Sequence, residues 1–324
     1  MFESLENNAI KKIEIIINLV NTHNTITDSL EPQDRIIAKE FYLSATVTKI
    51  YAILENFINE IISDYLDILS EVKSFSELSN AIKKEYRIGI SHILSKLDQK
   101  RYEHLVHEDI VKWYYEATHN IKNYRFVAPA LTRQEENYRL EKINTTFNRI
   151  DLCDFQSWVS NHTLLKVLFP LNDSIYTTLD SELKDFINLR NDASHGTLTN
   201  LEGDNSILTY TTLIINIIKV ITSFFRKTVI NIKEDKKLIN ELGNVTELFK
   251  KVQANIITCK KDSYLTKDLK VLILNNNECY IETIQSLQDQ GINIDEITIP
   301  NDNYELGVIF QNSVSINSKI YLLI

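Results

Sequence analysis

Arg190 and His195 are the two side chains whose chemistry and spacing draw attention first. They stand in the stretch Leu-Arg-Asn-Asp-Ala-Ser-His-Gly, residues 189–196. Histidine has an ordinary pKa near neutrality and can act as a general acid or base. Arginine keeps its charge and grips phosphate oxygens with a planar fork of N–H groups. RNA carries its own nucleophile, the 2′-OH, so cleavage needs a proton acceptor, a proton donor and positive charge. This pair, with Asn191 to orient a phosphate or ribose oxygen, fits that chemistry.

The elements that must position the pair follow from the surrounding pattern. The preceding apolar residues recur at helical spacing, which predicts a helix with one buried face. On a straight helix, five steps rotate by about 500°, so the two side chains would diverge by about 140°. Gly196 is the residue type that commonly follows a helix end. We therefore expect the helix to turn near Ser194 and to swing His195 back over Arg190.

A structural alternative stays open at this point, because the bare Arg-x4-His pattern is short. An arginine and a histidine at a helix end can simply be satisfied by backbone carbonyls and by Asp192. The full string, with its preceding apolar helix and following glycine, resembles the Arg-x4-His motif of the HEPN superfamily, most closely its RiboL-PSP branch. The resemblance implies an all-helical domain that dimerises and, in active members, a metal-independent RNA endonuclease. Some HEPN domains only bind.

A second resemblance lies in a long apolar stripe near the N-terminus. The residues 51–58, Tyr-Ala-Ile-Leu-Glu-Asn-Phe-Ile, resemble the long first core helix of RiboL-PSP HEPN domains. Glu55 lies beside that stripe and could contact the motif arginine; an exposed helix glutamate is the alternative. The predicted site thus has catalytic Arg190, Asn191 and His195, supported by Asp192, Ser194 and Glu55.

The helical part of the chain is predicted from residue 1 to 232 as an antiparallel bundle that folds by itself. The expected helices span residues 2–20, 32–69, 75–97, 102–121, 132–150, 154–169, the motif helix, and 207–229. The helix from 132 is placed by a Thr132-x-x-Glu135 capping box. Gly89 is a weak point within the third helix.

The remaining 92 residues change character. We expect a charged linker at 233–262, broken at Gly243, and a small β domain at 263–324. The order of its strands weakly resembles the six-stranded barrel that forms domain two of translation elongation factors. Such barrels usually bind RNA or protein partners, and a dimerisation or docking module is the alternative. The fold class is therefore mainly α with a small C-terminal β domain.

Metal and cofactor sites are not expected. Cys153, Cys259 and Cys279 are isolated, so they predict neither a metal-ligand pair nor a disulfide framework. His104 and His107 have zinc-compatible spacing but no marked third ligand. The chain contains no phosphate-binding glycine loop, nucleophile elbow or HExxH, which argues against ATPase, serine hydrolase and zinc protease activities.

The net charge of −9 means that RNA binding needs a local basic patch. A solvated charged face is the alternative explanation for the basic residues that could form one: Lys83, Lys84, Arg87, Lys96, Lys100, Arg101, Arg125, Arg133, Arg139, Lys142 and Arg149. The N-terminus has no signal-peptide pattern, and the apolar run 207–225 is interrupted by polar residues. We expect a cytoplasmic protein with a buried core helix there and no membrane partner.

Two functions remain after this reasoning. The first is a homodimeric HEPN endoribonuclease without cofactors that acts on RNA in prokaryotic defence or as a toxin, with an antitoxin or a defence-system partner. The second is a non-catalytic HEPN adaptor that binds RNA, a nucleotide or a partner protein. Neither the RNA target nor the trigger follows from the sequence.

Overall fold

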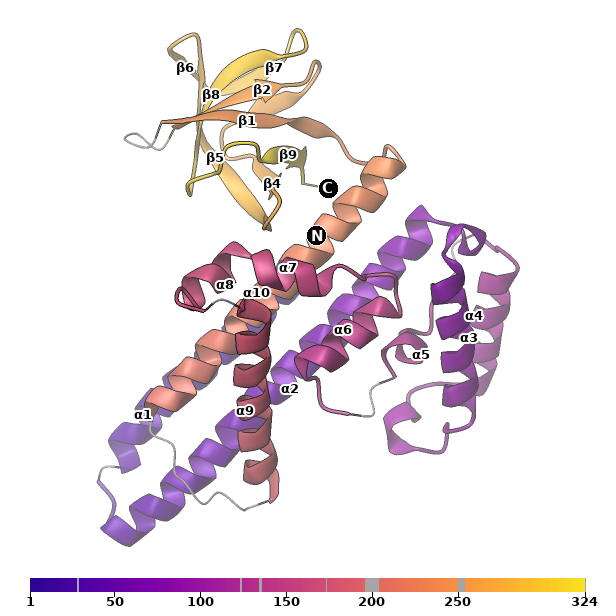
Figure 1. The fold of residues 1–324 in the computed structure, drawn as a ribbon, viewed down its shortest axis with the longest axis vertical. Coiled ribbons are helices and arrows are strands. Elements are labelled where there is room, and N and C mark those ends of the chain that lie inside the picture. Colours follow the sequence, from indigo (N-terminus) through magenta and orange to yellow (C-terminus); the bar gives the residue numbers. More distant parts are fainter. Residues whose placement is uncertain are drawn as a thin grey trace. The chain divides into compact units, whose positions relative to one another are not determined.

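The computed structural model of the chain forms two compact units (Figure 1). A helical unit spans Phe2–Thr222, and a C-terminal unit contains Met1 and Ser223–Ile324. The structure describes residues 1–27, 29–122, 124–133, 136–172, 174–195, 204–249 and 254–323. The mainly helical fold with a C-terminal β domain is confirmed.

Two long helices form the frame of the helical unit. Helix α1 (Glu3–Thr27) pairs with α2 (Pro32–Val72), and α2 also packs against α5 and the motif helix α9. Pro32 opens α2, where its missing N–H costs no helical hydrogen bond. The buried face of α2 is the apolar stripe seen in the sequence, which includes Tyr51, Leu54, Phe57 and Ile58. This stripe makes α2 the element on which the other helices assemble.

Shorter helices pack around this frame. They are α3 (Asn80–Leu94), α4 (His107–Thr118), α5 (Ala128–Thr132), α6 (Leu140–Asn148), α7 (Phe155–Asn161), α8 (Thr163–Leu168) and α9 (Ile175–His195), with 3₁₀ turns at Phe75–Glu77 and Lys100–Tyr102. The expected helix starting at the Thr132 capping box is wrong, because Thr132 ends α5 and α6 begins only at Leu140. Glu135 of that expected box lies outside the described residues.

At Gly89, α3 and α5 approach one another closely. A Cβ atom built on Gly89 would lie 1.8 Å from the backbone oxygen of Ala130, which is far inside van der Waals contact. Nearby, the Tyr86 hydroxyl accepts a hydrogen bond from the Val127 backbone N–H at 3.1 Å. The glycine that looked like a weak point of the third helix is therefore what allows α5 to sit on α3.

Helix α10 (Asp204–Asp235) is long and apolar enough, by length and composition, to cross a membrane. However, 61% of its apolar window is buried inside the protein, as expected for a core helix. Its start packs within the helical unit, where the rings of Tyr210 and Phe186 lie 5.4 Å apart. Its last part, from Ser223, belongs to the C-terminal unit.

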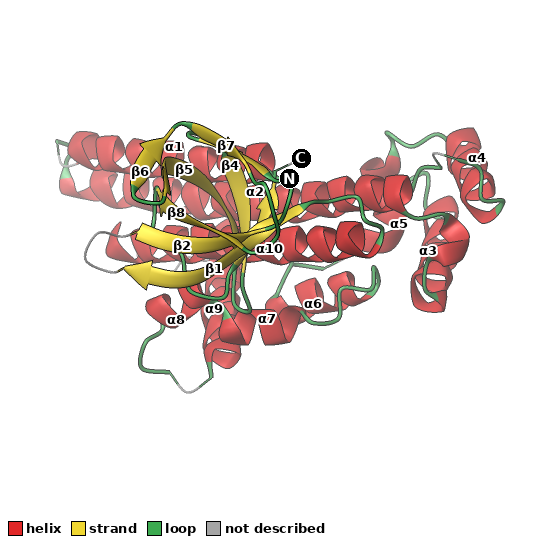
Figure 2. Ribbon diagram, turned by 90° about the horizontal axis from the view of Figure 1, so that it is seen from above, coloured by secondary structure: helices red, strands yellow, loops and turns green. Residues whose placement is uncertain are grey.

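The C-terminal unit contains a closed antiparallel barrel (Figure 2). The six barrel strands follow the order β4-β9-β1-β2-β8-β5, and pairing of β5 with β4 closes the ring. Strand β6 adds to β5, and β3 pairs separately with β7. The strands are β1 (Glu241–Phe249), β2 (Ala254–Cys259), β3 (Tyr264–Thr266), β4 (Lys270–Leu274), β5 (Cys279–Asp289), β6 (Ile292–Ile294), β7 (Glu296–Thr298), β8 (Tyr304–Phe310) and β9 (Lys319–Leu322).

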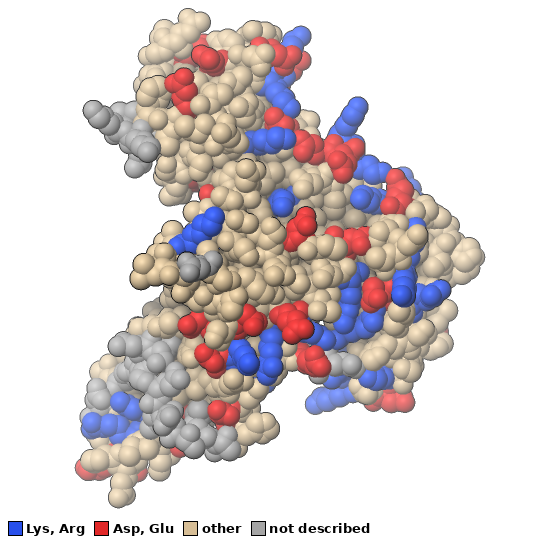
Figure 3. Space-filling view, in the orientation of Figure 1, with Lys and Arg blue, Asp and Glu red and all other residues tan. Residues whose placement is uncertain are grey.

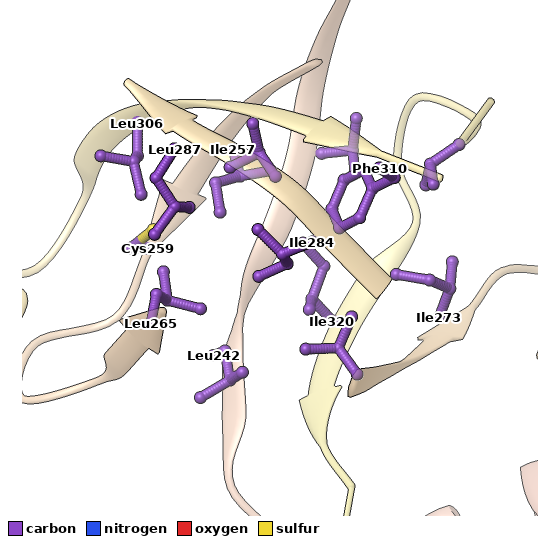
Figure 4. Close-up of a cluster of buried hydrophobic side chains, with 14 of the residues drawn as sticks. Leu242, Ile257, Cys259, Leu265, Ile273, Ile284, Leu287, Leu306, Phe310 and Ile320 are labelled. Carbon is purple, nitrogen blue, oxygen red and sulfur yellow. The ribbon is translucent and has the colours of Figure 1, made fainter. Parts of the chain in front are cut away.

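Alternating apolar residues fill the barrel. Figure 4 shows side chains such as Leu242, Ile257, Ile284 and Ile320 pointing toward one another in the interior. Two of these residues lie in the range 233–262, which was expected to be a linker. That expectation is wrong, because β1 and β2 are barrel strands.

Gly243 illustrates why this range was misassigned. It does not break a linker; it lies in β1, where the register with β9 shifts between Glu241 and Gly243. A Cβ there would lie 2.3 Å from the Thr258 carbonyl oxygen. The glycine thus allows the bulged strand to remain in the sheet.

Candidate functional site

Helix α9 carries the motif and remains helical through His195. Its predicted apolar residues Leu183 and Phe186 are fully buried. The Ser194 hydroxyl donates to the Arg190 carbonyl at 2.9 Å, a bond between residues one helical turn apart. The expected turn near Ser194 is therefore wrong, and Gly196 lies outside the described residues.

Arg190 is held at the inner side of α9. Its Nη1 donates to Asn191 Oδ1 at 3.0 Å and to Asn137 Oδ1 at 3.3 Å. Its guanidinium carbon lies 4.4 Å from the centre of the Tyr51 ring, a cation–π distance. The buried Nε has no hydrogen-bond partner among the described residues. The guanidinium is thus fixed in direction by two amides and an aromatic face.

Asn191 contacts both Arg190 and Asn137. Its Oδ1 also accepts a hydrogen bond from Asn137 Nδ2 at 3.2 Å, so Arg190, Asn191 and Asn137 form a triangle. The side chain expected to orient a phosphate or ribose oxygen thus contacts the arginine through its Oδ1. Asn137 comes from the segment before α6, more than fifty residues away in sequence.

Helix α2 carries Tyr51 and Glu55, which interact with Arg190 from another segment of the chain. The Tyr51 hydroxyl accepts a hydrogen bond from the Tyr138 backbone N–H at 2.9 Å, and burial raises the pKa of Tyr51 to about 12. One turn later, burial raises the pKa of Glu55, while the positive charge of Arg190 acts in the opposite direction. The two charges therefore interact, which agrees with the suggestion from the position of Glu55 beside the apolar stripe.

His195 does not join this group. It is exposed at the end of α9, as are Asp192 and Ser194. Because the helix is unbroken, five steps separate Arg190 and His195 by about 140° around its axis. The structure of one chain therefore does not bring the two motif side chains together.

A large polar cleft, of about 1260 Å³, adjoins the Arg190 group. We call it the α2–α6 cleft. Its walls are formed by Glu55, Asn59, Glu60, Ser63, Arg101, Tyr102, His104, Ala128, Pro129, Thr132, Glu136, Asn137, Arg139, Glu141, Lys142 and Thr145. Glu55 and Asn137 belong both to this lining and to the surroundings of Arg190.

Five of the eleven basic residues predicted to form a patch fall into two groups. Arg133 and Arg149 both pair with Glu85, and none of these three residues lines the cleft. Arg101, Arg139 and Lys142 line the cleft. In the space-filling view, Lys and Arg side chains gather over the α3–α6 side of the helical unit, with Asp and Glu interspersed (Figure 3).

Candidate metal ligands do not cluster in the described parts of the chain. No three His, Cys, Asp or Glu side chains lie together there as a metal site requires. His104 and His107 are both exposed, and His104 lines the α2–α6 cleft. Cys153, Cys259 and Cys279 are free thiols.

No sequence pattern pointed to Asn137. It lies in a polar stretch that we expected to be an exposed helix, and nothing in its spacing from Arg190 marks it. Tyr51 was visible only as a member of the apolar stripe. A polar residue in a loop can be linked to a distant arginine only once the chain is folded.

Comparisons with known proteins address the family. The family model described as RiboL-PSP-HEPN matches residues 7–234. Comparison with curated proteins found no significant match. Among solved structures, the chain is similar to the C-terminal domain of a protein assigned as a U32 peptidase of Geobacillus thermoleovorans, with 11% identity and a TM-score of 0.22. That match covers 25% of this chain and 96% of the other. Because the family match spans most of the chain, including α2 and α9, the protein belongs to the RiboL-PSP-HEPN family.

Proposed function

We propose that this protein is a metal-independent endoribonuclease that cuts RNA by attack of the ribose 2′-OH on the adjacent phosphate. The observation that carries the proposal is the preorganised guanidinium of Arg190, which two asparagines and the Tyr51 ring fix in direction. A fixed cation can stabilise the charge that develops on a phosphorane without reorganising during the reaction. Membership in the HEPN family supports RNA as the polymer.

Proton transfer is assigned to His195. The attacking and leaving oxygens lie on opposite sides of phosphorus, so one imidazole cannot easily serve both. Since His195 is exposed and turned away from Arg190 on the same helix, we propose that the complete site forms in a two-fold homodimer. There each protomer contributes one arginine and one histidine, because an isologous interface can place each motif beside its copy.

The direct test compares RNA degradation by wild-type protein and by His195→Ala at equal dose. We expect cleavage to survive EDTA and to leave 2′,3′-cyclic phosphate or 3′-phosphate ends. A substrate with 2′-deoxyribose at the scissile position should resist cutting. Loss of all activity on chelation, restored by Mg²⁺, would refute this acid–base mechanism.

Mixed dimers test the composite site. Heterodimers that combine wild-type and His195→Ala chains should fall far below half of the wild-type activity if both histidines serve one site. About half activity would mean independent sites and would overturn the shared arrangement.

A second candidate function is a non-catalytic HEPN adaptor that binds RNA, a nucleotide or a partner protein. It is favoured by the unbroken α9, which leaves Arg190 and His195 on different faces. Equal and negligible RNA degradation by wild type and His195→Ala would support this adaptor. A role in prokaryotic defence or as a cytoplasmic toxin is part of the first proposal, and toxicity on overexpression, relieved by His195→Ala, is its cellular test.

A further inference from the structure

The α2–α6 cleft is larger than the roughly 300–1,000 Å³ that usually hold one small molecule. Its walls come from the middle of α2, the 3₁₀ turn at 100–102, helix α5 and the start of α6. All of these belong to the helical unit. A cleft of this size is suited to several linked groups, such as successive nucleotides.

Three cations line the cleft in positions where they can meet phosphates. Arg139 is exposed immediately before α6 and has no ion-pair partner among the described residues. Lys142 lies in the first turn of α6, and its Nζ is 3.6 Å from a carboxylate oxygen of Glu136, whose side chain is 76% exposed. The Lys142 side chain itself is only 16% exposed, but its partner carboxylate lies largely in water and the contact is long, so a phosphate in the cleft can take the place of the carboxylate. Arg101 comes from the 3₁₀ turn, a separate segment of the lining.

The same cleft also presents hydrogen-bond acceptors. Four carboxylates line it, those of Glu55, Glu60, Glu136 and Glu141, and Asn59 contributes an amide. A site for phosphate alone would gain nothing from carboxylates, which repel it. Nucleotides combine an anionic phosphate with base edges that carry N–H donors, and carboxylates accept hydrogen bonds from such donors. Mixed charge therefore fits a polymer that exposes both groups.

Base edges are accessible in this way only when the bases are unpaired. In an RNA duplex the major groove is too deep and narrow for side chains, and sequence-specific recognition usually targets single-stranded segments. A cleft lined by short side chains such as Ser63 and Thr145 can contact the edges of splayed bases, whereas paired bases hide them.

The cleft is continuous with the surroundings of Arg190. Asn137 lines the cleft and accepts a hydrogen bond from Arg190, and Glu55 lines the cleft and is influenced by the charge of Arg190. A strand in the cleft therefore passes beside two residues, Asn137 and Glu55, that interact with the fixed guanidinium. We propose that the α2–α6 cleft binds unpaired nucleotides on one side of the scissile phosphate, with Arg139 and Lys142 on their phosphates. This inference rests on the proposed ribonuclease function for the identity of the polymer.

The experiment measures binding separately from cleavage. Full-length His195→Ala protein is titrated against a fluorescent, unstructured RNA oligonucleotide and against a duplex of the same length, with anisotropy as the readout. The test variant adds Arg139→Ala and Lys142→Ala. The control adds Lys84→Ala and Arg87→Ala, which remove the same charge from exposed positions on α3 outside the cleft lining. Circular dichroism of each variant verifies that the helices are retained.

We expect the cleft variant to lose about tenfold in affinity for the single strand, and the magnitude of its log–log salt slope to decrease by about 1.4, since two phosphate contacts are lost. The control should stay within about twofold, and the duplex should bind more weakly than the single strand. Equal losses in both double variants, or equal binding of duplex and single strand, would overturn the cleft assignment.

The two proposals can fail separately. If single-stranded RNA binds through Arg139 and Lys142 but wild-type protein does not cut it, the cleft assignment stands and the nuclease proposal fails. If wild-type protein cuts RNA and the Arg139→Ala, Lys142→Ala variant keeps the same KM, the nuclease proposal stands and the cleft assignment fails.

Discussion

Replacing Asn137 with alanine should loosen Arg190 without touching the motif itself. The substitution removes the 3.3 Å hydrogen bond from Arg190 Nη1 and the 3.2 Å bond to Asn191 Oδ1. A hydrogen bond to a charged group contributes about 1.5–3 kcal/mol and a neutral one about 0.5–1.5 kcal/mol. Both bonds are at or beyond the long end of the usual range, and Asn137 is only half-buried, so water can replace part of them. We therefore expect a loss of about 1–2 kcal/mol in the free energy of unfolding.

The measurement is a double-mutant cycle followed by thermal and urea unfolding. Asn137→Ala, Asn191→Ala and the double variant should show a coupling energy of about 1 kcal/mol, because the two amides contact one another and share Arg190. For a unit of this size, the single substitution should lower Tm by roughly 2–8 °C. Asn56→Ala, an exposed position on α2, is the control and should change Tm little.

The same variants test the link to function. A loosened guanidinium should lower kcat more than it raises KM, because its contribution is made mainly in the transition state. Additive effects on stability within about 0.3 kcal/mol, together with unchanged kcat in Asn137→Ala, would refute the argument that the asparagine triangle positions Arg190.

Three other predictions follow from burial and packing. Burial lowers the pKa of His162 from 6.5 to about 4, and its Nδ1 accepts a hydrogen bond from the Leu164 N–H. Between pH 4 and pH 6.5 the unfolded state therefore binds more protons than the folded state. The free energy of unfolding should then fall by roughly 3 kcal/mol from pH 6.5 to pH 4, and urea titrations of His162→Asn, which keeps a capping acceptor, should lack that part of the slope. Gly89→Ala should destabilise the protein by about 1–3 kcal/mol in thermal melts, because the new Cβ forces α5 away from α3 and outweighs the gain in helix propensity; an unchanged Tm would contradict this. In contrast to the expectation from the sequence that residues 1–232 fold by themselves, a chain that ends at Lys233 should bind a hydrophobic dye or aggregate, because it exposes Ile230, which is fully buried against barrel residues such as Tyr321. A monodisperse, cooperatively melting fragment would show that the helices suffice.

The local elements were determined largely by the sequence itself. Apolar residues at helical spacing specified α2 and α9, and Pro32 marked the start of α2 where the structure has it. The strand-like runs near the C-terminus specified a β domain. These features depend on residues a few positions apart, so spacing alone reveals them. The motif at Arg190 and His195 was equally local, and it led to the family that the comparison confirmed.

Tertiary structure decided how those elements meet. The barrel begins at Glu241, because β1 and β2 are needed to close the ring of strands. Pairing between strands far apart in the chain cannot be recognised from the local composition of a charged segment. Gly89 serves the approach of α5 to α3, which only the packed helices disclose. Asn137 reaches Arg190 across more than fifty residues of chain. The separation of Arg190 from His195 was decided by the continuation of α9 through residue 195. In each case the deciding contact joins segments far apart in sequence or follows from a helix end that local composition did not specify.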